Sequence, residues 1–102
     1  MDRAEMLKQV LEQNPNDAFA RYGLAMEYWR AGEVETALAE FRKLLAVHPD
    51  YVAGYQMAGQ MLSAAGRSEE ARQILESGIA SASRAGNKHA QEEMQGLLAD
   101  LR

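Results

Sequence analysis

The sequence has 102 residues, a formal net charge of −4, 47% hydrophobic residues and 25% charged residues. This length and composition predict one globular domain, and the mild acidity offers no basic surface for nucleic acid or an anionic membrane. The absence of cysteine excludes disulfides, thiolate metal ligands and a cysteine nucleophile.

Neither a signal peptide nor a membrane span is expected. Charged residues occupy the start of the chain, at positions 2, 3 and 5, where a signal peptide would have an apolar run. No stretch approaches the ~18 consecutive apolar residues of a transmembrane helix. We therefore expect a cytoplasmic protein with no membrane partner and no nucleic-acid partner.

Six helices are predicted from apolar residues that recur at steps of three and four, separated by proline and glycine signals. They cover residues 2–13, 17–31, 34–47, 51–65, 68–85 and 88–101. The first and last helices carry apolar residues on one side only, so each is expected to cap one end of the fold. The segment Asn14–Asp17 is expected to supply the N-cap oxygen of the second helix, and Ser68 is the expected N-cap of the fifth helix.

The first helix is expected to bury one apolar stripe. Its members are Ala4, Leu7, Val10 and Leu11, with Met6 beside them. Four of the methionines are expected to fill the core or its edge, because flexible thioethers fit irregular gaps. These are Met6, Met57, Met61 and Met94.

The second helix has two apolar faces. One face consists of Ala20, Leu24, Ala25 and Tyr28, and the other of Phe19, Tyr22, Met26 and Trp29. A helix that is apolar on two sides either buries both or binds a partner with one of them. Two interpretations of the aromatic face therefore stay open, a partner-binding surface and intramolecular burial, and Trp29 is the residue that most clearly separates them.

A period of 34 residues links the central helices. Leu24, Ala25, Tyr28, Gly32, Ala37 and Phe41 are followed 34 positions later by Ala58, Gly59, Leu62, Gly66, Ala71 and Leu75. This period, with small residues where two helices cross, is typical of an array of helix–turn–helix repeats.

These intervals, closed in the first copy by Pro49, resemble the tetratricopeptide repeat (TPR), whose pattern is tryptophan, leucine-glycine, tyrosine, alanine, phenylalanine and proline. Arg21 departs from this pattern at the tryptophan position. The resemblance covers the whole chain and implies a small stand-alone TPR protein. Its fold would be an all-α, right-handed α-solenoid of antiparallel helix pairs with about six helices. The implied parts are an N-terminal capping helix (1–17), repeat 1 (18–51), repeat 2 (52–85) and a C-terminal capping helix (86–102).

The resemblance further implies a concave groove, lined by the first helix of each repeat, that binds a peptide or another protein. The matching positions are Phe19, Tyr22, Met26, Trp29, Arg30, Ala53, Gln56, Gln60 and Ser63. Some family members clamp acidic C-termini of chaperones with lysine, asparagine and arginine; Tyr22, Met26 and Met57 stand at those positions here and argue against that use. The predicted function is a non-catalytic interaction module or adaptor. The alternative is a structural subunit that forms a homodimer through the same surface.

No catalytic, cofactor or metal site is predicted. His48 and His89 belong to different predicted elements, one in a turn and one in the last helix. Adjacent acids such as Glu92 and Glu93 point about 100° apart on a helix and so do not converge for acid–base chemistry. Gly32, Gly66 and Gly86 each end a helix singly and form no phosphate-binding loop.

Overall fold

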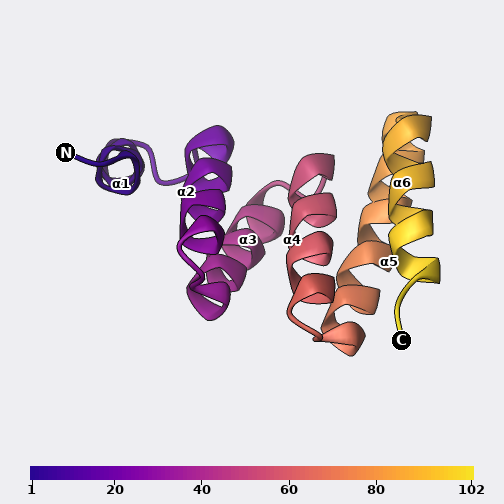
Figure 1. The fold of residues 1–102 in the computed structure, drawn as a ribbon. Helices are drawn as coiled ribbons and strands as arrows, with labels where there is room; N and C mark the ends of the chain where they lie inside the picture. Colours follow the sequence, from indigo (N-terminus) through magenta and orange to yellow (C-terminus); the bar gives the residue numbers. More distant parts are fainter. The chain divides into compact units, whose positions relative to one another are not determined.

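The computed structural model describes residues 1–102 as six α-helices without strands (Figure 1). The helices are α1 (Arg3–Gln13), α2 (Ala18–Arg30), α3 (Val34–Val47), α4 (Val52–Ala64), α5 (Ser68–Ala85) and α6 (Lys88–Ala99). The prediction of six helices is confirmed, and the observed ends differ from the predicted ones by about two residues at most.

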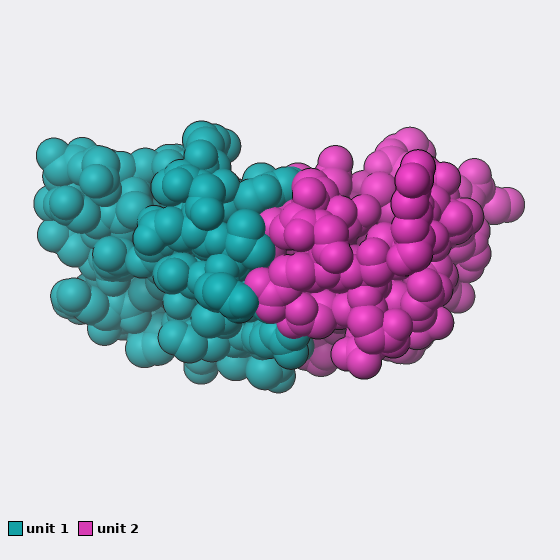
Figure 2. Space-filling model, turned by 60° about the horizontal axis from the view of Figure 1, so that its bottom comes forward, with its two compact units in different colours: residues 1–48 teal, residues 49–102 magenta.

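The chain forms two compact units, Met1–His48 and Pro49–Arg102 (Figure 2). In the first unit, α1 packs against α2 and α2 packs against α3. In the second unit, α4 packs against α5, and α6 packs against both. None of the six helices has the length and apolar character needed to cross a bilayer.

The core of the first unit follows the predicted apolar stripes. Leu11, Ala20 and Leu24 are buried together, with Ala4, Leu7 and Tyr28 packed against them. On α3, Ala37 and Phe41 are fully buried. The ring of Tyr22 meets the ring of Phe41 edge to face, with centroids 6.4 Å apart and an interplanar angle of 71°. Tyr22 therefore contributes to the packing of α2 on α3.

The core of the second unit depends on close helix contacts at Gly78. Leu62, Leu75 and Met94 are fully buried on three different helices. A Cβ atom at Gly78 would lie 2.5 Å from the Cβ of Tyr55 and 2.6 Å from the Sδ of Met94. The missing side chain of Gly78 is what lets α5 approach α4 and α6 this closely.

Two sequence predictions about α1 are wrong. Met6 and Val10 were expected to face inward, but they are 55% and 43% exposed. Since α1 packs against α2 through Ala4, Leu7 and Leu11, its Met6 side has no helix over it in this unit. Met61 and Met94 are fully buried as predicted, and Met57 is half-buried.

The helix ends follow the expected capping chemistry with one exception. Within the segment predicted to cap α2, Asp17 is the N-cap: its carboxylate accepts a hydrogen bond from the backbone N–H of Ala20 at 2.9 Å. Ser68, however, is the first residue of α5 and not its N-cap. The N-cap is Arg67, whose Nε donates to the Oε1 of Glu70 at 2.7 Å. The backbone N–H of Arg67 already closes α4 by donating to the carbonyl of Leu62, so the next helix starts directly after it.

Candidate partner-binding cleft

The aromatic side of α2 is the starting point of the candidate site. The opposite side of the helix buries Leu24 and Ala25 in the core. Phe19 is 67% exposed, the highest value among the large hydrophobic side chains except Met1. Tyr22, Met26 and Trp29 are half-buried, and Arg30 is exposed. This side of the helix is therefore exposed at both ends, at Phe19 and Arg30, and half-buried between them.

A cleft of about 210 Å³ lies along this side of α2, and Arg3 of α1 completes its lining. Its lining residues are Arg3, Phe19, Tyr22, Gly23, Met26, Glu27 and Arg30. Gly23 sits at the floor, where an added Cβ would lie 3.2 Å from a methyl group of Leu7. The glycine therefore keeps α1 and α2 in close contact beneath the cleft.

The charges at the rim are unequal. The Oε2 of Glu27 is 3.5 Å from the Nε of Arg3 and 2.5 Å from the Nη1 of Arg30. Two guanidinium groups thus share one carboxylate, and both arginine side chains are largely exposed. The rim carries an excess positive charge, which attracts a carboxylate from solution.

The predicted groove residues divide into two groups. Phe19, Tyr22, Met26 and Arg30 line the same cleft, whereas Trp29 is not among its lining residues. The remaining predicted residues, Ala53, Gln56, Gln60 and Ser63, follow one another along α4 in the second unit.

The α4 residues have surroundings of their own. The Nε2 of Gln56 donates to the Oε2 of Glu93 at 2.6 Å. Ser63 lines a separate hollow of about 400 Å³ beside Leu101 and Arg102, and Gln60 is exposed. Of the four predicted α4 residues, Ala53 and Gln60 are thus the exposed ones, and Gln60 has the longer side chain.

Sequence reasoning missed Arg3 and Glu27. The pair formed by Glu27 and Arg30 has a readable signal, because residues three apart on a helix are neighbours. Arg3 has none, since it reaches Glu27 from another helix and no sequence spacing encodes that contact.

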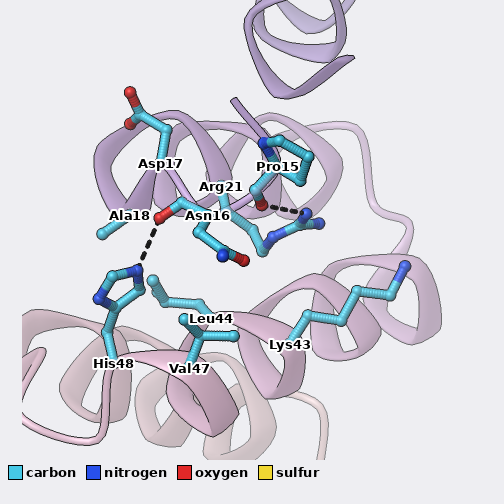
Figure 3. Close-up of a pocket in the computed structure, with 9 residues that line it drawn as sticks. All are labelled: Pro15, Asn16, Asp17, Ala18, Arg21, Lys43, Leu44, Val47 and His48. Carbon is cyan, nitrogen blue, oxygen red and sulfur yellow. Dashed lines mark hydrogen bonds between the residues drawn. The ribbon is translucent and has the colours of Figure 1, made fainter. Parts of the chain in front are cut away.

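A second, much smaller pocket lies where the N-terminal turn of α2 meets the end of α3 (Figure 3). It measures about 10 Å³, room for about one water molecule. The Nε2 of His48 donates to the carbonyl of Asn16 across it at 2.7 Å. This pocket is a packing detail and is too small for a ligand.

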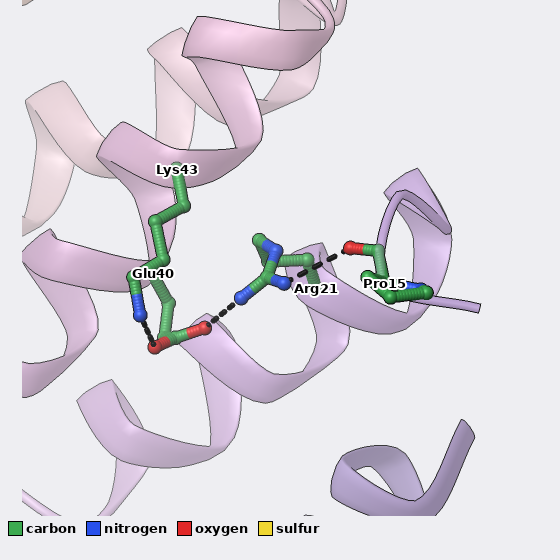
Figure 4. A network of polar contacts seen from close by, with 4 residues as sticks. All are labelled: Pro15, Arg21, Glu40 and Lys43. Atoms are coloured by element: carbon green, nitrogen blue, oxygen red, sulfur yellow. Dashed lines mark hydrogen bonds and ion pairs between the residues drawn. The ribbon is translucent and has the colours of Figure 1, made fainter. Parts of the chain in front are cut away.

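Arg21, the residue at the tryptophan position, is held beside this pocket. Its Nη1 is 2.6 Å from the Oε1 of Glu40, and its Nη2 donates to the carbonyl of Pro15 at 3.0 Å (Figure 4). Lys43 adds a longer contact to Glu40, 3.5 Å from Nζ to Oε2. Both members of the main pair are mostly buried, with side chains 18% and 11% exposed. A buried ion pair thus occupies the place of the expected aromatic ring.

No metal centre is apparent in the geometry. No group of three or more histidine, cysteine, aspartate or glutamate side chains is arranged to hold an ion. His89 pairs with Glu93 on the surface of α6, and His48 bonds to a backbone carbonyl.

Comparison with known proteins identifies the class. The family model described as tetratricopeptide repeat matches residues 4–50 and 28–101. TPR repeat-containing protein PA0015 of Pseudomonas aeruginosa is 35% identical over 97 residues, which cover 95% of this chain and 92% of the relative. The fold is an all-α helical repeat of the solenoid class. The chain belongs to the tetratricopeptide repeat family.

Solved structures agree with this assignment. The solution structure of a tetratricopeptide repeat domain protein from Salinibacter ruber has a TM-score of 0.79 at 30% identity, covering 87% of this chain and 90% of that one. Protein BPP2914 from Bordetella parapertussis has a TM-score of 0.83 at 29% identity, with coverages of 99% and 88%.

A more distant neighbour shares the fold alone. The TPR2B domain of yeast Sti1, solved in a complex with pHsp70, has a TM-score of 0.86 at 17% identity, with coverages of 94% and 77%. TPR folds commonly mediate protein–protein interaction, and the family is typically a non-catalytic scaffold.

Proposed function

We propose that this protein is a non-catalytic interaction module that binds a peptide or protein partner in the cleft between α1 and α2. The observation that carries the proposal is the exposure of Phe19, 67%, at the edge of a cleft lined by Tyr22 and Met26. Exposed apolar patches bordered by polar groups usually mark interaction sites. Aromatic side chains are also the commonest residues to dominate binding energy at such sites.

The partner's chemistry follows from the lining. One apolar side chain of the partner fills the space between Phe19 and Met26. An acidic residue beside it meets Arg3 and Arg30, which together outnumber the single carboxylate of Glu27. The motif is therefore a leucine- or methionine-like residue next to aspartate or glutamate. Gln60 on α4 and the half-buried Trp29 are secondary contact positions in this proposal.

The test compares two short peptides by NMR titration of the isotope-labelled protein. One peptide carries leucine flanked by aspartate and glutamate, and the other carries leucine flanked by lysines. We expect the acidic peptide to shift the amide signals of residues 19–30 and to bind at least about tenfold more tightly than the basic one. Equal binding of the two peptides, or shifts elsewhere in the chain, would remove the support for this cleft.

Phe19→Ala is the matched variant. Because Phe19 is exposed, its truncation should leave the melting temperature nearly unchanged. It should lower the affinity for the acidic peptide by about tenfold or more. Sedimentation at several concentrations covers the alternative of a self-associating subunit. A dimer that becomes monomeric in Phe19→Ala would replace the adaptor function with homodimerisation through the same surface.

A further inference from the structure

The side of α1 that faces away from its core contacts is open and apolar. Met1, Met6 and Val10 are among the most exposed large hydrophobic side chains of the chain. Together with three polar residues they line a shallow hollow of about 640 Å³. The lining is Met1, Met6, Gln9, Val10, Gln13 and Asn14, and is named here the α1 face.

The 34-residue period shows what such a face normally contacts. Counting 34 residues onward from Gln9, Val10, Gln13 and Asn14 gives Lys43, Leu44, Val47 and His48. These four residues are the α3 side of the small pocket in Figure 3, where α3 meets the N-terminal turn of α2. Counting from Met6 gives Glu40, the partner of Arg21 (Figure 4). The α1 face is thus equivalent to the side of α3 that meets α2, where Glu40 and Leu44 are buried while Lys43 and Val47 stay exposed.

The second unit repeats this relationship. Val10 corresponds to Gly78 of α5, which lies against Tyr55 of α4 so closely that a Cβ atom would not fit. In both complete helix pairs, then, the preceding helix covers the position equivalent to Val10. Leu44 is 1% exposed under its helix, whereas its equivalent Val10 is 43% exposed. The α1 face has the shape of a helix-docking surface without a helix on it.

The differences between α1 and α3 indicate the occupant's chemistry. Met6 replaces the carboxylate of Glu40, so the residue opposite it must be apolar where α2 has Arg21. Two charged residues on α1 make no ion pair, Glu5 and Glu12, and both are acidic. A third acid, Asp2, caps the start of the helix. The two nearby cations are already engaged with α2: Arg3 pairs with Glu27, and Lys8 lies 5.7 Å above the ring of Tyr28.

A second copy of this chain fits the face poorly. Its own α1 would bring the same three acids against Asp2, Glu5 and Glu12. The apolar stripes of α3 and α5 are already buried, as Phe41 and Leu75 show. Charge complementarity favours a different occupant with basic residues along its edge.

We infer that the α1 face docks an amphipathic helix of a partner protein, with an apolar stripe flanked by lysine or arginine, in the position that α2 occupies on α3. The docked helix covers Met6 and Val10 and completes a helix pair with α1. Helix-in-groove recognition of this kind reads apolar residues at steps of three and four. This surface is separate from the cleft lined by Phe19, so one protein can hold two partners.

The probe is a synthetic helix of about 14 residues with a leucine and alanine stripe flanked by lysines. Side-chain staples hold it helical, because a free peptide of this length is only marginally helical in water. A second stapled peptide with glutamates in place of the lysines is the charge control. Each is titrated into isotope-labelled protein, and the shifted amide signals identify the bound surface.

We expect the lysine peptide to shift signals of α1 and to bind at least about tenfold more tightly than the glutamate peptide. The double variant Met6→Gln/Val10→Gln should lower the affinity for the lysine peptide by about tenfold or more. Glutamine is a good helix former, and both positions are exposed, so the variant should keep its helix content and melting temperature. Phe19→Ala, which disables the cleft, should change this affinity by less than about twofold.

Three results of the titrations would overturn the inference. These are no binding of the lysine peptide at millimolar concentration, shifts confined to residues 19–30, and equal affinity for both peptides. A concentration-dependent dimer abolished by Met6→Gln/Val10→Gln would also overturn it, since the occupant would then be a second copy. Failure of Phe19→Ala to weaken the acidic peptide of the previous section bears on the cleft alone.

Discussion

Arg21 and Tyr55 stand at the same position of successive repeats and donate the same hydrogen bond. The Nη2 of Arg21 donates to the carbonyl of Pro15 at 3.0 Å, and the hydroxyl of Tyr55 donates to the carbonyl of Pro49 at 2.8 Å. Both acceptors are prolines 34 residues apart. The position is therefore defined by a donor that reaches the proline before its helix, and a guanidinium and a phenol both supply it.

Arg21→Ala should destabilise the first unit strongly. The change leaves the mostly buried Glu40 with only its longer contact to Lys43, at a cost of about 3 kcal/mol. Chemical denaturation of the purified variant measures this loss. A variant as stable as the unmodified protein would show that the ion pair contributes nothing.

Copying the equivalent pair of the second repeat should restore stability. The double variant Arg21→Tyr/Glu40→Ile places the Tyr55 and Ile74 side chains into repeat 1. Replacing a buried ion pair by packed apolar groups is often neutral or stabilising by about 1–4 kcal/mol. We expect the double variant to unfold at or above the denaturant midpoint of the unmodified protein, with Glu40→Ile alone below it. A double variant less stable than Arg21→Ala would contradict the equivalence of the two positions.

Two glycine-to-alanine changes should have opposite signs. Gly78→Ala forces a methyl group into contact with Tyr55 and Met94, and overpacking of this kind typically costs about 1–3 kcal/mol. At Gly96 no neighbouring atom lies within 4 Å of an added Cβ, so alanine should stabilise α6 by about 0.5–1 kcal/mol. Thermal melts of both variants test this. A shift in the same direction for both would argue against the tight contact at Gly78.

The Tyr55 hydroxyl should make the second unit sensitive to alkali. Burial raises the pKa of Tyr55 above its ordinary value of about 10. The folded state therefore holds this proton more tightly than the unfolded state. The resulting stability is fully present below about pH 10 and is lost as the pH rises through the higher folded-state pKa.

Tyr55→Phe is the control for this effect. At pH 8 it should be less stable by about 1 kcal/mol, the value of the lost hydrogen bond to Pro49. As the pH rises above 10 the difference from the unmodified protein should shrink, because only the unmodified protein loses the tyrosine contribution. Denaturation curves at several pH values measure it. A constant difference from pH 8 to pH 11 would contradict the raised pKa.

Deleting residues 88–102 should abolish cooperative unfolding of the second unit. Met94 is fully buried and α6 packs against both α4 and α5, so the deletion exposes apolar surface on two helices. We expect aggregation, measured by light scattering, or a broad melt, measured by circular dichroism. Removing only residues 100–102, which leaves α6 whole, is the control. If the variant without residues 88–102 stayed monomeric and melted sharply, it would contradict a capping function for α6.

The positions of the helices and most of the core were predictable because a strict period reports which residues face a neighbouring helix. Met6 and Val10 were assigned wrongly for a physical reason. Helical spacing shows that a side of α1 is apolar, but it carries no information on whether another helix lies there. The same limit applies to Ser68, since the N-cap depends on where the preceding turn closes.

The candidate cleft was predictable only in part. The aromatic side of α2 could be read from the spacing of Phe19, Tyr22 and Met26. Its charged rim could not, because Arg3 comes from another helix. Glu40 had a weaker signal: it is a carboxylate inside an apolar stripe, at a position where the next repeat has Ile74, and opposite an arginine that replaces an aromatic residue.

The bonds to Pro15 and Pro49 also indicate where a transplantable module of this protein begins. A segment of residues 15–48 contains Pro15 with its donor Arg21, the Arg21–Glu40 pair, and the bond from His48 to Asn16. A segment of residues 49–82 likewise contains Pro49 with both of its donors, Tyr55 at 2.8 Å and Ser81 at 3.1 Å. Cuts at residues 18 and 52 would separate each proline from the helix that holds it. Gene duplication or protein engineering that lengthens this array therefore conserves every one of these bonds when the inserted cassette starts at the proline.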